Sequence, residues 1–250
     1  MNITAAISGE APQTIWQRWS CTRQWVCAVL VAAAGMAEPA HADSIFVGIA
    51  SFEVPERMRL GKVGDSMRIN GIDTQVYSFE SELSADELAH HFARQWPGQM
   101  KRGQAGPWSV LSHRQDDYLV TVQIAGAGFG RTRGFISASE IFAWLKRKPR
   151  PRKLDVPLLA RTQILQRIES EDYGRHSRTL ILVSEKSAAQ NMDFYRTHFR
   201  TQGYAPITRT ALRRGAQGGA MALERDGTQL NISAAQQAGM TIVALVQVGP

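Results

Sequence analysis

Apolar side chains recur at steps of four between residues 84 and 96, which is the spacing of one helix face. They are Leu88, Phe92 and Trp96. Ser84 and Glu87 stand at the start of this face in the pattern of a capping box, in which the serine oxygen accepts hydrogen bonds from the free amides of the first turn. The pattern predicts a helix that begins at Ser84 and ends at Pro97.

A second stretch, from residue 187 to residue 199, repeats this arrangement. Ser187 and Gln190 form another capping-box pattern, and Gly203 is placed to end the helix. Tyr195 and Phe199 fall where Phe92 and Trp96 fall when the two serines are superposed. The two helical patterns therefore indicate an internal repeat, which decides the fold prediction.

Strand patterns surround both predicted helices. Around the first helix they are residues 45–49, 76–79, 108–111 and 118–124, with a closing strand from 135. Around the second helix they are residues 179–183, 221–223, 229–233 and 240–248. Asn70-Gly71 and Asp226-Gly227 are dipeptides typical of tight hairpin turns.

These patterns predict the α+β fold class, with two tandem β-α-β-β-β repeats at residues 43–140 and 156–250. Each repeat is expected to form an antiparallel or mixed sheet with one main helix. Because one helix cannot cover both faces of such a sheet, we expect the repeats to pack on each other as a pseudo-dimer. Residues 141–155 are predicted to be a basic, proline-containing linker.

The first 42 residues have the layout of a secretory signal peptide. Arg18 and Arg23 precede a short apolar run at residues 25–37, and Ala40-His41-Ala42 is a small-x-small cleavage site. We expect cleavage after Ala42 and a periplasmic or otherwise exported protein; the alternative is an uncleaved anchor. Both cysteines of the chain, at positions 21 and 27, lie in this leader, so no disulfide or thiol chemistry is expected after it.

The net charge of +7 is concentrated in one segment. The leader contributes two basic and two acidic residues, so the rest of the chain keeps the whole excess. Six of the positive charges belong to the predicted linker, and we assign them as candidates for binding an anionic partner: Lys146, Arg147, Lys148, Arg150, Arg152 and Lys153. An envelope protein or an anionic membrane surface is the expected partner, and nucleic acid is not expected. The alternative is a solvated linker with no partner.

The sequence contains no catalytic signature that we recognise. His90 and His91 are adjacent on a predicted helix and cannot share a face, so they do not form a zinc site. The glycine-rich stretch at 126–130 lacks the lysine of a phosphate loop and is interpreted as a hairpin tip, beside which Arg131 and Arg133 are weak candidates for binding an anion. Glu169, Glu171 and Asp172 are interpreted as a solvated acidic turn that could also meet the basic segment. No metal, cofactor or catalytic residue is expected.

The function that these observations favour is a non-enzymatic binding or assembly module of a bacterial envelope, such as an accessory of a secretion or pilus system. This expectation is an analogy of architecture, because small α+β repeats without catalytic residues serve such systems as adaptors. The alternative is an enzyme or a small-ligand carrier with a site in the cleft between the two repeats.

Overall fold

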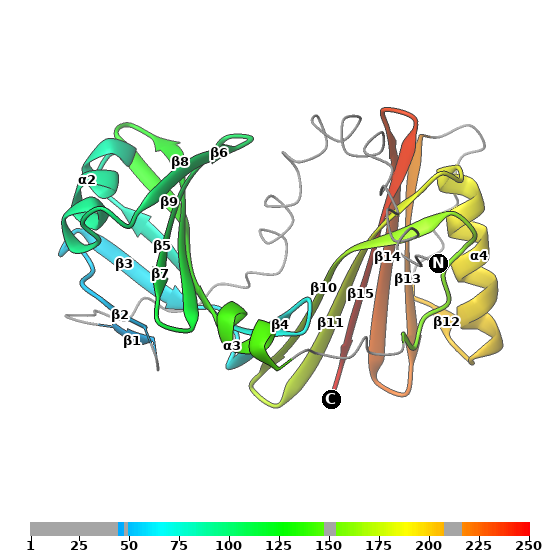
Figure 1. Cartoon of the computed structure of the whole chain (residues 1–250). Helices are drawn as coiled ribbons and strands as arrows, with labels where there is room; N and C mark the ends of the chain where they lie inside the picture. The colour runs from blue at the N-terminus through cyan, green and yellow to red at the C-terminus, as the bar shows by residue number, and fades with distance from the viewer. Residues whose placement is uncertain (1–44, 48–49, 148–153, 208–216) are drawn as a thin grey trace, which may run out of the picture.

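The computed structural model describes residues 45–47, 50–147, 154–207 and 217–250 (Figure 1). The strands of the first half are β1 (Ile45–Val47), β2 (Ala50–Phe52), β3 (Met58–Lys62), β4 (Ser66–Ile69), β5 (Ile72–Ser81), β6 (Lys101–Ala105), β7 (Trp108–Gln115), β8 (Tyr118–Gly128) and β9 (Arg131–Ser139). Those of the second half are β10 (Thr162–Asp172), β11 (Arg175–Ser184), β12 (Ala205–Pro206), β13 (Gly218–Arg225), β14 (Thr228–Gln237) and β15 (Met240–Gly249). The helices in these ranges are α2 (Ala85–Gln95), α3 (Ile141–Lys146) and α4 (Ala188–Thr201).

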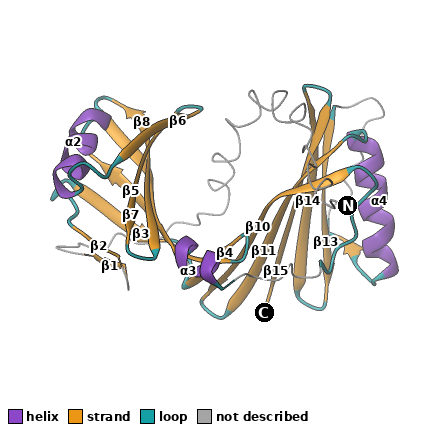
Figure 2. Ribbon diagram, viewed as in Figure 1, coloured by secondary structure: helices purple, strands orange, loops and turns teal. Residues whose placement is uncertain are grey.

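The predicted α+β class, with two β-α-β-β-β repeats packed as a pseudo-dimer, is wrong. More than half of the described residues lie in strands, and the three helices among them are short (Figure 2). Thirteen strands form one antiparallel sheet, because β4 pairs with β5 on one side and with β10 on the other. The two halves are therefore joined edge to edge by hydrogen bonds, and within the described ranges no face of one is packed on the other in the manner of a pseudo-dimer.

The strand order runs outward from the β4–β10 pair. On one side it is β5-β9-β8-β7-β6, and on the other it is β11-β15-β14-β13-β12, while β3 pairs with the outer part of β5. In Figures 1 and 2 the helices α2 and α4 lie on the two outer flanks, so the uncovered faces of the two half-sheets are turned toward each other. These uncovered faces are called the inner faces below.

Both predicted capping boxes are confirmed. The hydroxyl of Ser84 accepts from the amide of Glu87, and the hydroxyl of Ser187 accepts from the amide of Gln190. In each case the side chain at the third helical position accepts in return from the amide of the serine. Local hydrogen bonding thus fixes the start of α2 and of α4.

A hydrophobic core lies beneath each of these two helices. Under α2 the fully buried side chains include Phe92, Leu111 and Val120, and under α4 they include Tyr195 and Leu182. The aromatic residues that the helical spacing placed on one face are buried there, as predicted. Each half-sheet therefore gains its stability mainly from one outer face, where apolar side chains of strands and helix leave water together.

Strand β10 was missed by the sequence patterns. Its pairing with β11 shifts register between Ile164 and Gln166, so that an additional residue interrupts the alternation of polar and apolar positions. The prediction of an acidic turn at Glu169, Glu171 and Asp172 is wrong, because these residues belong to β10. Glu169 lies opposite Arg178 of β11 and opposite Arg68 of β4.

Candidate functional site

The junction between the two half-sheets carries a row of alternating charges. Asp73 of β5 lies opposite Arg68 of β4, which lies opposite Glu169 of β10, which in turn lies opposite Arg178 of β11. Gln247 of β15 is the next member of the row. Residues directly opposite one another in a sheet point to the same face, so these side chains form one line across five strands.

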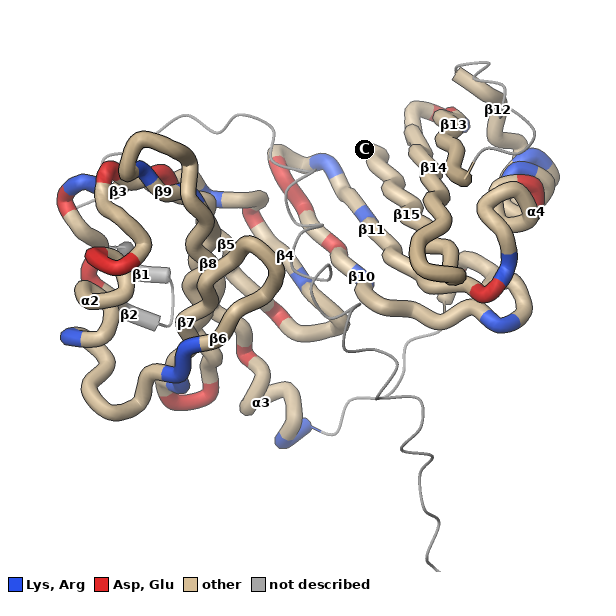
Figure 3. Tube along the Cα trace, turned by 90° about the horizontal axis from the view of Figure 1, so that it is seen from above, with Lys and Arg blue, Asp and Glu red and all other residues tan. Residues whose placement is uncertain are grey.

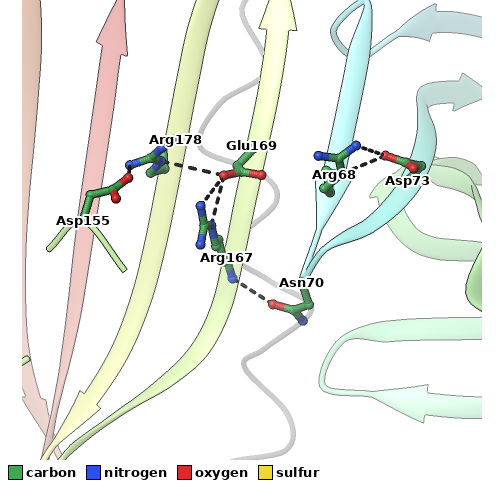
Figure 4. Close-up of polar contacts among 7 residues, drawn as sticks. All are labelled: Arg68, Asn70, Asp73, Asp155, Arg167, Glu169 and Arg178. Carbon is green, nitrogen blue, oxygen red and sulfur yellow. Dashed lines mark hydrogen bonds and ion pairs between the residues drawn. The ribbon is translucent and has the colours of Figure 1, made fainter. Parts of the chain in front are cut away.

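The charged side chains of this row take part in two groups of contacts, one between Arg68 and Asp73 and one around Glu169 (Figure 4). Both Nε and Nη2 of Arg68 lie 2.8 Å from Oδ1 of Asp73. Nη1 of Arg178 lies 2.7 Å from Oδ2 of Asp155, and its Nε lies 3.9 Å from Oε1 of Glu169. Arg167, two residues before Glu169 on the same strand, donates to the same carboxylate oxygen.

The network is electrically balanced. The three arginines face three carboxylates, those of Asp73, Asp155 and Glu169. Arg167 and Glu169 are the least exposed members, with side chains that are 16% and 24% accessible. Pairs this close to solvent each contribute about 1 kcal/mol or less to stability, so the network orients its side chains more than it stabilises the fold.

Asn70, which directly follows β4, links the turn after this strand to β10 by two hydrogen bonds. Its backbone amide donates to the carbonyl oxygen of Arg167 over 2.7 Å, and its side-chain oxygen accepts from the amide of Arg167 over 2.8 Å. Asn70 occupies the left-handed region, with a φ of 52°, in the predicted Asn-Gly turn between β4 and β5. One turn residue thus holds a strand of the second half.

A cavity of about 500 Å³ opens beside this row, and we call it the junction cavity. Strands β4, β10, β11, β14 and β15 and the start of β5 contribute its walls. Ser66, Ser170 and Ser177 also border it, and Oγ of Ser170 lies 2.7 Å from Oγ of Ser177 on the face of the sheet opposite to Glu169 and Arg178. His176 stands at the rim with a side chain that is 67% exposed, and its Nδ1 lies 3.8 Å from Glu171. Figure 3 shows basic and acidic positions interspersed over this part of the sheet.

A second cavity, of about 260 Å³, shares Ser66, Met67 and Asp73 with the junction cavity. The hydroxyl of Tyr118 donates to Oε1 of Glu140 there, over 2.9 Å. Burial, together with the neighbouring Glu140 carboxylate, raises the pKa of Tyr118 to about 12. This tyrosine therefore keeps its proton at neutral pH and acts as a hydrogen-bond donor.

The sequence-predicted site, the basic run, is only partly within the described residues. Lys146 ends α3, with Nζ 2.6 Å from Oδ1 of Asp117, and Arg147 lies 3.4 Å from Glu140. Lys148, Arg150, Arg152 and Lys153 lie outside the described residues, as does the predicted signal peptide at 1–42. The structure does not bring Lys146 or Arg147 into the junction cavity.

The junction site itself was missed by sequence reasoning. Its members come mainly from residues 66–73, 169–178 and 247–250, and only the fold brings these distant segments together. Among the described residues there is no group of three or more His, Cys, Asp or Glu side chains that could hold a metal ion. Within the same ranges, no helix has the length and apolar character needed to cross a membrane.

Comparison of the chain with protein-family models, with curated proteins and with solved structures finds no match.

Proposed function

We propose that the protein is an exported, non-enzymatic binding module of a bacterial envelope, and that it docks a partner protein at the junction cavity. The observation that carries this proposal is that basic and acidic side chains alternate along the wall of an open cavity of about 500 Å³. Two guanidinium groups, those of Arg68 and Arg178, and three carboxylates, those of Asp73, Glu169 and Glu171, lie along its wall. We also propose, as part of this function, that the protein serves as an accessory of a secretion or pilus assembly.

The presence of both signs of charge along the wall favours a protein partner over a simple ion. A free anion or cation would gain attraction from one sign of the row and repulsion from the other. A protein surface with charges of both signs can match the row, and complementary patterns of this kind supply specificity at interfaces. The hydroxyl group of Ser66, which lies opposite Glu171 and on the same face as Arg68, adds a donor and an acceptor that a partner backbone can use.

The pairing also favours binding over catalysis. A general acid or base needs a group that is free to reach a substrate proton. Here Arg68 and Arg178 of the row, and Arg167 beside it, each have a carboxylate within hydrogen-bond distance. These groups are arranged to present a fixed pattern rather than to exchange protons.

An exchange of charges within one pair tests the proposal. The double variant Arg68→Asp and Asp73→Arg keeps an ion pair at the site but inverts its direction. We expect thermal stability close to that of the wild type and loss of a photo-crosslink from position 176 to an envelope protein in the native host. The matched control exchanges the exposed pair Asp193 and Arg196 on α4. Retention of the crosslink in the junction variant contradicts the proposal, as does its loss in the control.

Export is tested separately. Mass spectrometry of the mature protein from its own host is expected to give a chain that begins at Asp43, because Ala42 ends the small-x-small site. An intact leader in a soluble cytoplasmic fraction contradicts export.

The basic run remains a second candidate contact with an anionic surface. If it binds lipid, each lysine or arginine contributes about 1 kcal/mol, weakened by salt. Replacement of all six basic residues by serine is expected to leave the melting temperature nearly unchanged and to abolish salt-sensitive binding to anionic vesicles. The pairs of Lys146 and Arg147 are exposed, so their loss costs little stability. Vesicle binding that persists in this variant leaves the solvated linker as the interpretation.

A further inference from the structure

A cavity of about 350 Å³ lies on the inner face of the first half-sheet, opposite α2 and apart from the junction cavity. Strands β3, β5 and β9 and the start of β7 line it. Its apolar wall contains Trp108 and Phe135, which are 7% and 8% exposed and whose ring centroids lie 5.9 Å apart. A volume of this size is at the lower end of the range for small-molecule sites.

The strand register places a charged row beside this aromatic pair. Arg59 of β3 lies opposite Glu80 of β5, and Glu80 lies opposite Arg133 of β9. In the neighbouring row, Ser78 lies opposite Phe135. Because residues two apart on a strand share a face, the two arginines stand on the same side of the sheet as the aromatic wall. The adjacent strand spacing of about 4.8 Å sets the backbones of the two arginines about 10 Å apart, with Glu80 between them.

These charges differ from those of the junction cavity. Neither Arg59 nor Arg133 makes an ion pair or a side-chain hydrogen bond with any described residue, although Glu80 stands between them. The row carries one positive charge in excess, and its two guanidinium groups keep their donors available. Guanidinium groups are suited to bidentate contacts with carboxylates.

The aromatic wall complements the arginines. Trp108 and Phe135 are packed in a cluster with Val76, and the small part of each residue that stays exposed borders the charged row. The hydroxyl of Ser78 donates to the carbonyl oxygen of Gly61, so its proton is not available to a ligand carboxylate in the cavity. A ligand that fills the cavity needs an anionic end and a flat apolar body.

We propose that this cavity binds a small aromatic carboxylic acid, with the carboxylate held by Arg59 and Arg133 and the ring against Trp108 and Phe135. The site is independent of the docking surface at the junction. Glu80 repels the ligand carboxylate and lowers the affinity, so it sets the threshold concentration at which the site fills.

Calorimetric titration with 2-naphthoate tests the site, with 2-naphthylmethanol as the neutral analogue of the same shape. We expect 2-naphthoate to bind about tenfold or more tightly than the alcohol, because charge-assisted hydrogen bonds to guanidinium are lost in the latter. The substitution Arg133→Gln or Arg59→Gln should weaken 2-naphthoate binding about tenfold. The substitution Glu80→Gln should strengthen it, which a merely structural role for Glu80 does not produce.

Arg102→Gln is the matched control. Arg102 lies on β6 of the same half-sheet and is exposed. It faces away from the cavity because it lies opposite Leu111, whose side chain belongs to the core under α2. The substitution Arg102→Gln removes the same charge as Arg59→Gln and should leave the affinity for 2-naphthoate unchanged. Circular dichroism melts check that each variant is folded, and amide shifts in NMR spectra should centre on Ser78 and Phe135. Equal binding of the alcohol, weaker binding in Glu80→Gln, or an equal effect of Arg102→Gln each overturns the proposal.

Discussion

At the scale of single residues, Gly134 of β9 is tightly constrained by packing. A Cβ at this position would lie 1.8 Å from the carbonyl oxygen of Gln123 and 2.7 Å from ring carbons of Phe79. The ring of Phe79 therefore lies where a side chain would stand, and it belongs to the core under α2. Glycine is required here by close approach and not by a left-handed backbone.

We expect Gly134→Ala to lower the free energy of unfolding by about 1–3 kcal/mol, because the core must shift to admit a methyl group. Gly103→Ala, on the exposed edge strand β6, meets nothing within 4 Å and should change stability by no more than about 0.5 kcal/mol. Urea unfolding of both variants measures the difference. Equal stabilities would show that the sheet relaxes around Gly134 without cost.

His113 of β7 makes the free energy of unfolding depend on pH. Its ring stacks on Trp96 at a centroid distance of 5.0 Å, and its Nδ1 is buried without a hydrogen-bond partner. Burial lowers the pKa of His113 below its ordinary value of 6.5, partly offset by a hydrogen bond with the backbone of Gln99. Protonation is therefore more favourable in the unfolded chain than in the folded one.

The sign of the effect follows from this difference. As the pH falls below about 6.5, the unfolded state takes up the proton first, so the free energy of unfolding decreases. We expect His113→Phe to reduce this loss, since phenylalanine keeps the stacking and does not titrate. Urea unfolding at pH 7.5, 6.5 and 5.5 compares the two proteins. A ring pKa of His113 at or above 6.5, measured by NMR, would contradict the argument.

At the scale of elements, the two capping boxes start α2 and α4 independently of the rest of the chain. Ser84→Ala and Ser187→Ala should each cost about 1 kcal/mol, because each leaves first-turn amides without their side-chain acceptor. Glu87→Gln should be close to neutral, since Gln190 makes the same reciprocal bond in α4 with an amide oxygen. Thermal unfolding checks all three variants. A loss in Glu87→Gln as large as in Ser84→Ala would mean that charge, not geometry, supports the cap.

The helices and strands also show which elements could be predicted from the sequence and which could not. The helices were predicted because capping residues and apolar spacing are local signals, as at Ser84 and Ser187. The strand β6 was missed because Lys101 and its neighbours are an exposed edge with no apolar alternation. The strand β10 was missed because the irregular register at Ile164 breaks the period of two. Both failures concern strands whose stability comes from their neighbours and not from their own composition.

At the scale of the whole molecule, the joint between the halves depends on contacts that no local pattern encodes. Strand β4 pairs with β10 over four positions, from Ser66 opposite Glu171 to Ile69 opposite Ile168. The charged row and the junction cavity exist only because this pairing brings the strands together. Neither could be predicted from composition, whereas the Asn70-Gly71 turn beside them could.

We expect Asn70→Gly to loosen this joint. Glycine tolerates the left-handed backbone of the turn, so the variant removes mainly the side-chain acceptor for the amide of Arg167. Spin labels at Asp86→Cys on α2 and Ala189→Cys on α4 should then show a broader distance distribution by electron paramagnetic resonance. Both natural cysteines precede residue 43, so a chain begun at Asp43 carries no other thiol.

The control for this experiment is Asp226→Gly. Asp226 also precedes a glycine in a left-handed turn, with a φ of 50°, but it joins β13 to β14 away from the joint. The distribution should keep its width in this variant. Equal broadening in both variants, or in neither, would show that Asn70 does not hold the halves together.

The pairing of Ile69 with Ile168 also means that β4 is synthesised well before its partner strand β10, because the two residues are 168 − 69 = 99 positions apart. A ribosome that adds about 5–20 residues per second delivers β10 about 5–20 seconds after β4. The neighbouring strands β5 to β9 are complete by Ser139, well before that moment. During the interval the nascent first half presents β4 as an open edge, which is the stage at which mispairing with another chain, and protection by a chaperone, have their greatest effect.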